Sequence, residues 1–169
     1  MIWLVVLPAA PKTFPATLRI WTDSAKSEPP WMTHHLILDT GPWVALHCRD
    51  DNHHEWAKDE FAQHSGPFLT CEAVVAETCF LLARQGFDPA KAVALIERGV
   101  VQVNFHLGEQ VSAVRALFER YDNVPASLAD ACLIRMTELL EPCKVLTLDS
   151  DFQIYRRYGR KVIPTISPL

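Results

Sequence analysis

The sequence lacks several features that would place it outside the ordinary class of globular domains. Its 169 residues contain no apolar run approaching the roughly 20 residues of a membrane-spanning helix, so we expect a cytoplasmic protein with no membrane partner. The five cysteines form no CxxC pair, which argues against a disulfide framework or a zinc ribbon. Basic residues number 16 against 20 acidic ones. This balance argues against a broad nucleic-acid surface but allows a local one.

Residues 1–31 differ in composition from the rest of the chain. They hold five of the 12 prolines and show no sustained helical or strand period. The apolar stretch at their start is short and lacks the basic region of a signal peptide. Met32 then precedes the first clear strand segment. We therefore predict that residues 1–31 are a disordered extension or a mis-assigned start, and that residues 32–169 form one domain.

Short apolar segments alternate with amphipathic ones through this domain. Strands are predicted at 35–39, 67–70, 100–105, 144–148 and 161–166. Helices are predicted at 50–64, 71–86, 88–99, 109–121 and 125–140, with Gly86 and Gly99 as helix-ending residues, and a short helical turn is predicted at 151–158. Continuous apolar strands between helices are typical of a parallel sheet covered on both faces. The pattern predicts an α/β fold with a mainly parallel central sheet.

Four carboxylates are expected to meet at one edge of this sheet. Asp39 and Asp149 follow apolar strand segments, and the carboxyl ends of parallel strands share the edge where ligands bind. Glu77 interrupts the apolar stripe of its helix, and Asp130 lies in the first turn of another helix. These positions make all four acids candidates for one site.

Each acid also has a purely structural interpretation. Asp39 and Asp149 can cap the segments that follow them, Ser127 and Asp130 match a capping box, and Glu77 can pair with a buried arginine. Together, however, four unpaired carboxylates repel one another, and no basic residue is spaced to neutralise all of them. Mg²⁺ or Mn²⁺ would do so, because these ions accept oxygen ligands and need only one or two carboxylates directly. Such a site suits phosphoryl chemistry.

The four segments resemble, in order, the motifs of the PIN domain, and in particular those of the VapC-type toxin ribonucleases of prokaryotic toxin–antitoxin pairs. The matching stretches are LILDTGPWVAL with Asp39, EAVVAETCFLL with Glu77, VPASLADACLIRMTE with Asp130 and VLTLDSDF with Asp149. The resemblance covers residues 35 to about 163. It departs from the family at Ser127, where relatives often carry a further acid, although serine can still cap the helix.

The resemblance implies a three-layer α/β/α sandwich and a metal-dependent endoribonuclease that leaves 5′-phosphate and 3′-hydroxyl ends. One or two Mg²⁺ or Mn²⁺ ions would be held by Asp39, Asp130 and Asp149, with Glu77 bound directly or through water. Auxiliary roles would fall to Thr40, Ser127, Thr147 and Asp151. The implied partners are an RNA substrate such as tRNA or rRNA, a second copy in a homodimer, and a cognate antitoxin whose C-terminal segment occupies the acidic groove.

Three other interpretations stay open at this point. The first is a PIN-fold protein that binds RNA or a partner without cleaving. The second is a zinc protein, with ligands drawn from His34, His35, His53, His54 and Cys48. The third is a purely structural α/β domain. Arg156 and Arg157 are interpreted as solvated surface residues, with an RNA-backbone contact as the alternative.

Overall fold

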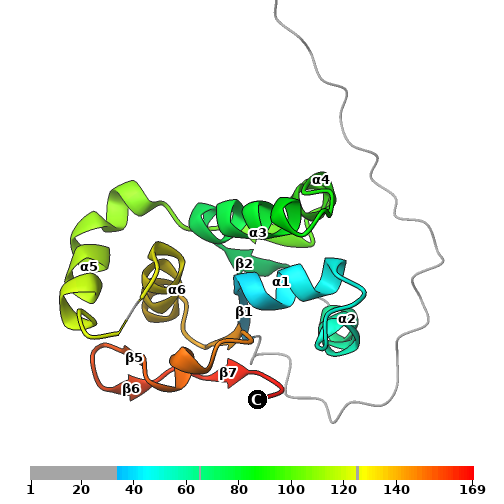
Figure 1. Ribbon diagram of the computed structural model, residues 1–169. Coiled ribbons are helices and arrows are strands. Elements are labelled where there is room, and N and C mark those ends of the chain that lie inside the picture. Colours follow the sequence, from blue (N-terminus) through cyan, green and yellow to red (C-terminus); the bar gives the residue numbers. More distant parts are fainter. Residues whose placement is uncertain (1–33, 65, 125) are drawn as a thin grey trace, which may run out of the picture. The chain divides into compact units, whose positions relative to one another are not determined.

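The computed structural model describes residues 34–64, 66–124 and 126–169, and its centre is a five-stranded sheet (Figure 1). The strands are β1 (His35–Leu38), β2 (Phe68–Thr70), β3 (Val101–Val103), β4 (Cys143–Leu146) and β7 (Thr165–Ile166). They lie in the order β3-β2-β1-β4-β7, and every neighbouring pair is parallel. The predicted parallel sheet is therefore confirmed.

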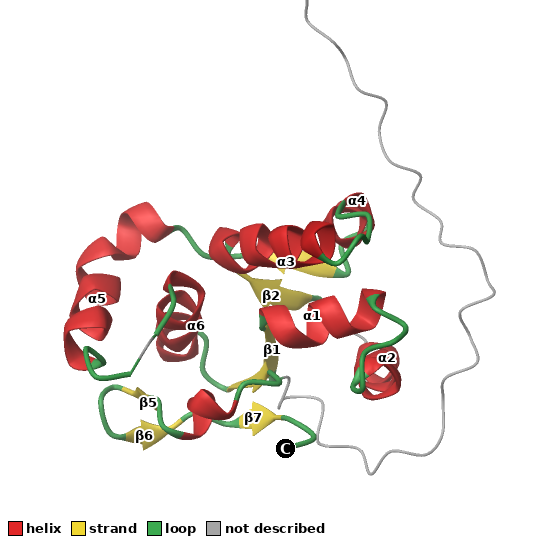
Figure 2. Ribbon diagram, in the orientation of Figure 1, coloured by secondary structure: helices red, strands yellow, loops and turns green. Residues whose placement is uncertain are grey.

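Helices cover both faces of the sheet. They are α1 (Thr40–His47), α2 (His54–Gln63), α3 (Glu72–Arg84), α4 (Ala90–Glu97), α5 (Leu107–Arg120) and α6 (Leu128–Leu139), with a short 3-10 helix η2 (Ser150–Gln153). Figure 2 shows α1 and α2 on one side of the central strands and α5 and α6 on the other. This arrangement is the three-layer α/β/α sandwich that the sequence predicted.

The strand order creates a switch point between β1 and β4. From β1 the chain proceeds to β2 and then β3 on one side, and β4 is added on the opposite side of β1. In open α/β sheets, ligands bind beyond the carboxyl ends of the strands at such a switch point. Leu38 and Leu146 are paired in register at the ends of β1 and β4. The residues that follow these two leucines therefore line the predicted binding edge.

The core explains why the site can be held firmly. Ile37, Leu38, Val145 and Leu146 are fully buried between the helix layers, and so is Trp43 of α1. Burying an aliphatic or aromatic side chain of this size contributes roughly 1.5–3 kcal/mol. The carboxyl-terminal halves of the two strands that carry the switch point are thus fully buried.

One predicted helix begins later than expected in the structure. The helix predicted over residues 50–64 begins only at His54, and a further helix, α1, lies outside the predicted ranges at residues 40–47. Between the two helices, the Asp51 side chain accepts a 2.8 Å hydrogen bond from the His53 amide and holds a turn. Gly86 and Gly99 have φ values of 82° and 73°, so the predicted helix ends at these glycines are confirmed.

The helical turn predicted over residues 151–158 ends at Gln153, so the prediction is wrong for residues 154–158. The guanidinium of Arg156 donates to the carbonyl oxygens of Gln153, Ile154 and Tyr155 at 2.6–2.9 Å, which ends the helical turn. The chain then enters β5 (Arg156–Arg157), which pairs antiparallel with β6 (Lys161–Val162). This β5–β6 hairpin is a separate two-stranded sheet.

The single strand predicted over 161–166 is likewise divided in two. Pro164 lies between β6 and β7 and has no amide hydrogen for a strand ladder. β6 joins the hairpin, whereas β7 joins the central sheet beside β4. Of these two strands, only β7 therefore lies at an edge of the central sheet.

Two expectations concern regions or properties beyond the central fold. The proposed extension, residues 1–31, lies outside the described residues. Within the part of the chain that the structure does describe, no helix is both long and apolar enough to cross a membrane.

Candidate active site

Asp39 is fixed by hydrogen bonds to both of its carboxylate oxygens. It directly follows β1 and is only 6% exposed. Its Oδ1 accepts a 2.6 Å bond from the Thr40 amide, and its Oδ2 accepts a 2.6 Å bond from the Thr147 hydroxyl. The side chain is therefore both the N-cap of α1 and a cross-link to the segment after β4.

The pKa of Asp39 is raised from its ordinary value to about 7. Burial is the largest cause, because desolvation penalises the charged form. The bonds from Thr147 and Thr40 lower the pKa, whereas the charges of Asp130 and Asp149 raise it further. Asp39 thus lies in the electrostatic field of two other predicted site residues.

Asp130 occupies the first turn of α6 and is buried. Its Oδ2 accepts from the Ser127 amide at 2.8 Å, and its own amide donates to the Ser127 hydroxyl at 3.1 Å. This is the predicted capping box. Burial raises the pKa of Asp130, the Ser127 bonds lower it, and the neighbouring charges of Asp149 and Glu77 raise it.

Two threonines connect the acids to one another. The Thr40 hydroxyl donates to Glu77 at 3.0 Å, while the Thr40 amide donates to Asp39. The Thr147 hydroxyl donates to Asp39 and accepts a 2.9 Å bond from the Asp149 amide. Asp39 is therefore joined through one hydroxyl residue to Glu77 of α3 and through another to Asp149.

Asp149 and Asp151 form the entry to η2. The Asp149 side chain accepts a 2.8 Å hydrogen bond from the Asp151 amide and caps the 3-10 helix. Asp149 contributes to the raised pKa of both Asp39 and Asp130, whereas Asp151 is not among the causes given for either. Asp149 therefore interacts more strongly than Asp151 with the charges of Asp39 and Asp130.

The structural interpretation is therefore correct for three of the acids. Asp39, Asp130 and Asp149 all cap helices. The fourth interpretation is not: among the described residues, no lysine, arginine or histidine forms an ion pair with Glu77 or with the other three acids. The caps supply neutral donors but no positive charge, so the mutual repulsion of the four acids is left uncompensated.

The donor set fits a hard divalent cation. It consists of carboxylate and hydroxyl oxygens, the ligands that Mg²⁺ and Mn²⁺ prefer. Within residues 34–64, 66–124 and 126–169, no three histidine, cysteine or acidic side chains form a ready-made ligand group. Mg²⁺ does not require one, because it keeps several waters and binds through one or two carboxylates.

The zinc interpretation finds no support in the described residues. Cys48 donates its thiol hydrogen to Gln85 at 3.2 Å, and the His54 ring lies 2.8 Å from the Ala45 carbonyl oxygen. The five cysteines are all free, and four of them are buried. The proposed zinc ligands therefore do not gather into a group.

Tyr155 is a site neighbour that sequence reasoning missed. Its side chain is fully buried, and its hydroxyl has no hydrogen-bond partner. Burial raises the pKa of this phenol, and the charges of Asp130, Asp151 and Asp149 raise it further, which places it close to the acids. The sequence did not indicate this burial, because a helical period over residues 151–158 does not distinguish Tyr155 from its neighbours.

The interpretation of Arg157 as a solvated residue is wrong, because its side chain is only 12% exposed and forms a 3.1 Å ion pair with Glu141. Arg156 is half-buried, and its guanidinium donates to the carbonyl oxygens at the end of η2.

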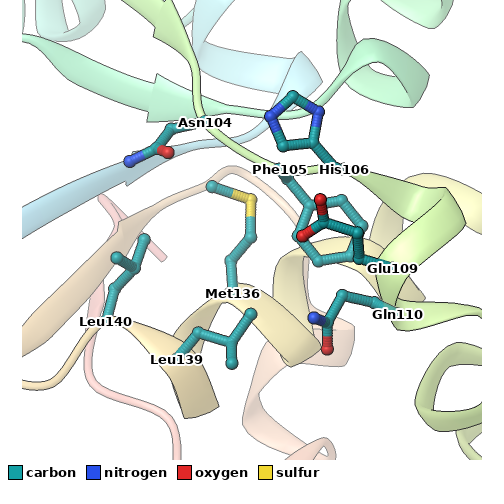
Figure 3. A pocket seen from close by; sticks show the side chains of 8 residues that line it. All are labelled: Asn104, Phe105, His106, Glu109, Gln110, Met136, Leu139 and Leu140. Carbon is teal, nitrogen blue, oxygen red and sulfur yellow. The ribbon is translucent and has the colours of Figure 1, made fainter.

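A small cavity of about 210 Å³ lies away from these acids (Figure 3). It is bounded by Phe105 and His106 after β3, by Glu109 of α5, and by Met136 and Leu139 of α6. None of the predicted site residues lines it. The acids are instead presented at the edge of the sheet.

Comparison with known proteins agrees with this geometry. Residues 36–158 match the PIN domain family. Among solved structures, the fold is similar to that of Mycobacterium tuberculosis VapC20, a toxin that cleaves the sarcin-ricin loop, with a TM-score of 0.62, 24% identity, and coverage of 70% of this chain and 93% of that one. No curated protein matches the sequence. Since the family match spans well over half of the chain, the resemblance is confirmed and the chain belongs to the PIN domain family.

Proposed function

We propose that the protein is a divalent-metal-dependent endoribonuclease and the toxin of a toxin–antitoxin pair. One arrangement supports the proposal: Asp39, Glu77, Asp130 and Asp149 lie near the switch point of a PIN-domain sheet, and no cation of the described residues pairs with them. Burial is the largest cause of the raised pKa of Asp39, and the charges of Asp130 and Asp149 raise it further. Phosphodiester hydrolysis is the reaction that an all-oxygen metal site of this kind serves.

The roles of the residues follow from their contacts. Asp39, Asp130 and Asp149 would hold Mg²⁺ or Mn²⁺, and Glu77 would bind it directly or through water. A bound ion polarises the phosphoryl oxygen and lowers the pKa of the attacking water. Thr40 and Thr147 hold the carboxylates in orientation through their hydroxyl groups. Ser127 does the same for Asp130, and Asp151 for Asp149, through backbone amides.

The partners are proposed by analogy with the structural neighbour. VapC20 acts on the sarcin-ricin loop, which supports a structured RNA, either rRNA or tRNA, as the substrate here. A cognate antitoxin would occupy the acidic edge, where an arginine could neutralise the carboxylates. We also propose a homodimer in the cytoplasm.

Purified protein, free of antitoxin, should be incubated with tRNA and with rRNA fragments in Mg²⁺, in Mn²⁺ and in EDTA. The proposal predicts cuts that require metal and that leave 5′-phosphate and 3′-hydroxyl ends. No cleavage, together with a rise in melting temperature on adding metal, would favour a non-catalytic PIN-fold binder. No cleavage and no response to metal would mean that the acids have only a structural role.

A further inference from the structure

Positive charge is concentrated where the β5–β6 hairpin meets the end of α5. The exposed side chains of Arg160 and Lys161 follow the hairpin turn at Tyr158 and Gly159. The Arg120 guanidinium, from the last turn of α5, reaches within 3.2 Å of the position that a Cβ atom would take at Gly159. We call Arg120, Arg160 and Lys161, together with the ring of Tyr158, the basic hairpin.

Within the part of the chain that the structure describes, no carboxylate forms an ion pair with this charge. Among the ion pairs of the described residues, none includes Arg120, Arg160 or Lys161. The ammonium of Lys161 lies 5.2 Å from the ring centroid of Tyr158 instead. In a chain with a net charge of −4, three adjacent cations without carboxylate partners attract an anion from outside.

The basic hairpin is fixed to the rest of the domain. The Tyr158 amide and hydroxyl both donate to Glu138 of α6, each at 2.7 Å. The Tyr121 hydroxyl accepts a 2.8 Å bond from the Arg156 amide and joins β5 to the end of α5. Because these bonds hold the turn, its cations lie on a preformed surface, and little ordering is needed before a ligand binds.

The basic hairpin and the acids are attached to different ends of α6. Glu138, which holds Tyr158, lies eight residues after Asp130. At 1.5 Å per residue this separation is about 12 Å along the helix axis. The two anchor points are therefore about two helical turns apart on α6, so the basic hairpin is a surface distinct from the acidic edge.

We propose that the basic hairpin binds the phosphate backbone of the RNA substrate outside the cleaved bond. The inference rests on the proposed ribonuclease function and extends it. Arginine and lysine contacts to phosphates position a nucleic acid without reading its sequence. The acidic edge repels RNA where no metal is bound, and a separate cationic surface would offset this repulsion when the substrate first binds.

The test uses the full chain carrying Asp39→Asn, so that RNA is bound without being cut. The affinity for a fluorescein-labelled RNA stem-loop is measured by anisotropy at several salt concentrations. Arg160→Ala/Lys161→Ala should weaken binding about tenfold and reduce the salt slope by about two, one for each lost phosphate contact. The control Lys58→Ala/Lys91→Ala removes the same charge from exposed positions on α2 and α4, and it should leave both quantities unchanged.

Further variants separate charge from packing. Arg160→Lys/Lys161→Arg keeps both charges and should bind as tightly as the parent chain. With Asp39 restored, Arg160→Ala/Lys161→Ala should raise KM about tenfold and leave kcat unchanged, since the cations lie away from the reacting bond.

Several results would overturn the inference. Equal RNA affinity and equal salt slopes in the hairpin variant and the control would do so, even if cleavage is observed. Weaker binding of polyglutamate but not of RNA would assign the surface to an acidic protein partner instead. If no variant binds RNA and the parent chain does not cleave it, the proposed function fails as well.

Discussion

The acidic edge of the sheet and the basic hairpin are opposites in charge. Within the described residues, Asp39, Glu77, Asp130 and Asp149 form no ion pair with a cation, and Arg120, Arg160 and Lys161 form none with a carboxylate. Asp39 is held by a neutral group, the Thr147 hydroxyl, whereas the hairpin turn is held by the Glu138 carboxylate, which accepts from the Tyr158 amide. Like charges that lie together repel one another, and a ligand of opposite charge relieves that repulsion.

The two regions differ in burial, and burial determines the desolvation free energy of charges that have no ion-pair partner. Asp39 is 6% exposed and Asp130 is 9% exposed, so both are desolvated and their pKa values are raised. The cations of the hairpin are exposed and stay hydrated. The acidic edge should therefore respond strongly to a cation or to protons, and the basic hairpin only weakly to its ligand.

The largest expected effect follows from removing one charge from the acidic edge. Asp39→Asn keeps an oxygen to cap α1 but loses the negative charge, and cleavage should fall by roughly 1,000-fold, because a bound metal contributes several kcal/mol to catalysis and each 1.36 kcal/mol is tenfold. Asp59→Asn, at an exposed position of α2, is the control and should cleave normally. Full activity of Asp39→Asn in a single-turnover assay would refute the assigned role.

The pH dependence of stability tests the same carboxylate without any substrate. Because the pKa of Asp39 is raised to about 7, the folded metal-free protein holds a proton that the unfolded chain releases near pH 4. The free energy of unfolding should therefore decrease as pH rises toward 7, with this group contributing up to about 4 kcal/mol. Asp39→Asn should flatten the slope between about pH 4 and pH 7 in urea titrations. An identical slope in the variant would contradict the assignment.

A smaller effect is expected when the link between two acids is removed. Thr147→Val deletes the hydroxyl that joins Asp39 to the Asp149 amide, and metal affinity and cleavage should fall roughly 10- to 100-fold. Thr137→Val is the control, because this buried hydroxyl donates to the Ile134 carbonyl and not to an acid. Equal losses of activity in both variants would reduce Thr147 to a packing role.

No effect is expected from shortening the chain. A protein beginning at Met32 should match the full chain in melting temperature and in cleavage, because the acidic edge and the basic hairpin both lie within residues 36–169. Failure of this shorter protein to fold would show that residues 1–31 belong to the domain.

Local patterns in the sequence were sufficient to predict the acidic edge. An apolar strand followed at once by Asp39, and a serine three residues before Asp130, each specify a position through neighbouring residues alone. The parallel topology then brings such positions together, since all strands of the sheet end at the same edge. The sequence could therefore propose the four acids and their threonines by residue number, and their role in a metal site stays a prediction.

The hairpin could not be predicted in the same way, because distant contacts determine it. β5 is anchored through Tyr121, which lies 35 residues before Arg156, and the turn is held by Glu138, which lies 20 residues before Tyr158. A short sequence window around residues 154–158 includes neither Tyr121 nor Glu138. These residues were therefore predicted as part of a helical turn. Tyr155 was missed for a related reason, since its burial follows from packing against Tyr121 and Phe152.

Equilibrium binding of Mn²⁺ is the most direct test of the central claim that the four acids share a divalent cation. Isothermal titration of the metal-free protein at pH 7.5 should detect Mn²⁺ binding. In further titrations at lower pH, the affinity should weaken about tenfold for each pH unit below 7, because Asp39 takes up its proton. Asp39→Asn should lose this binding, whereas Asp59→Asn should retain it. Mn²⁺ binding of equal strength in Asp39→Asn, or its absence from the parent chain, would contradict the claim.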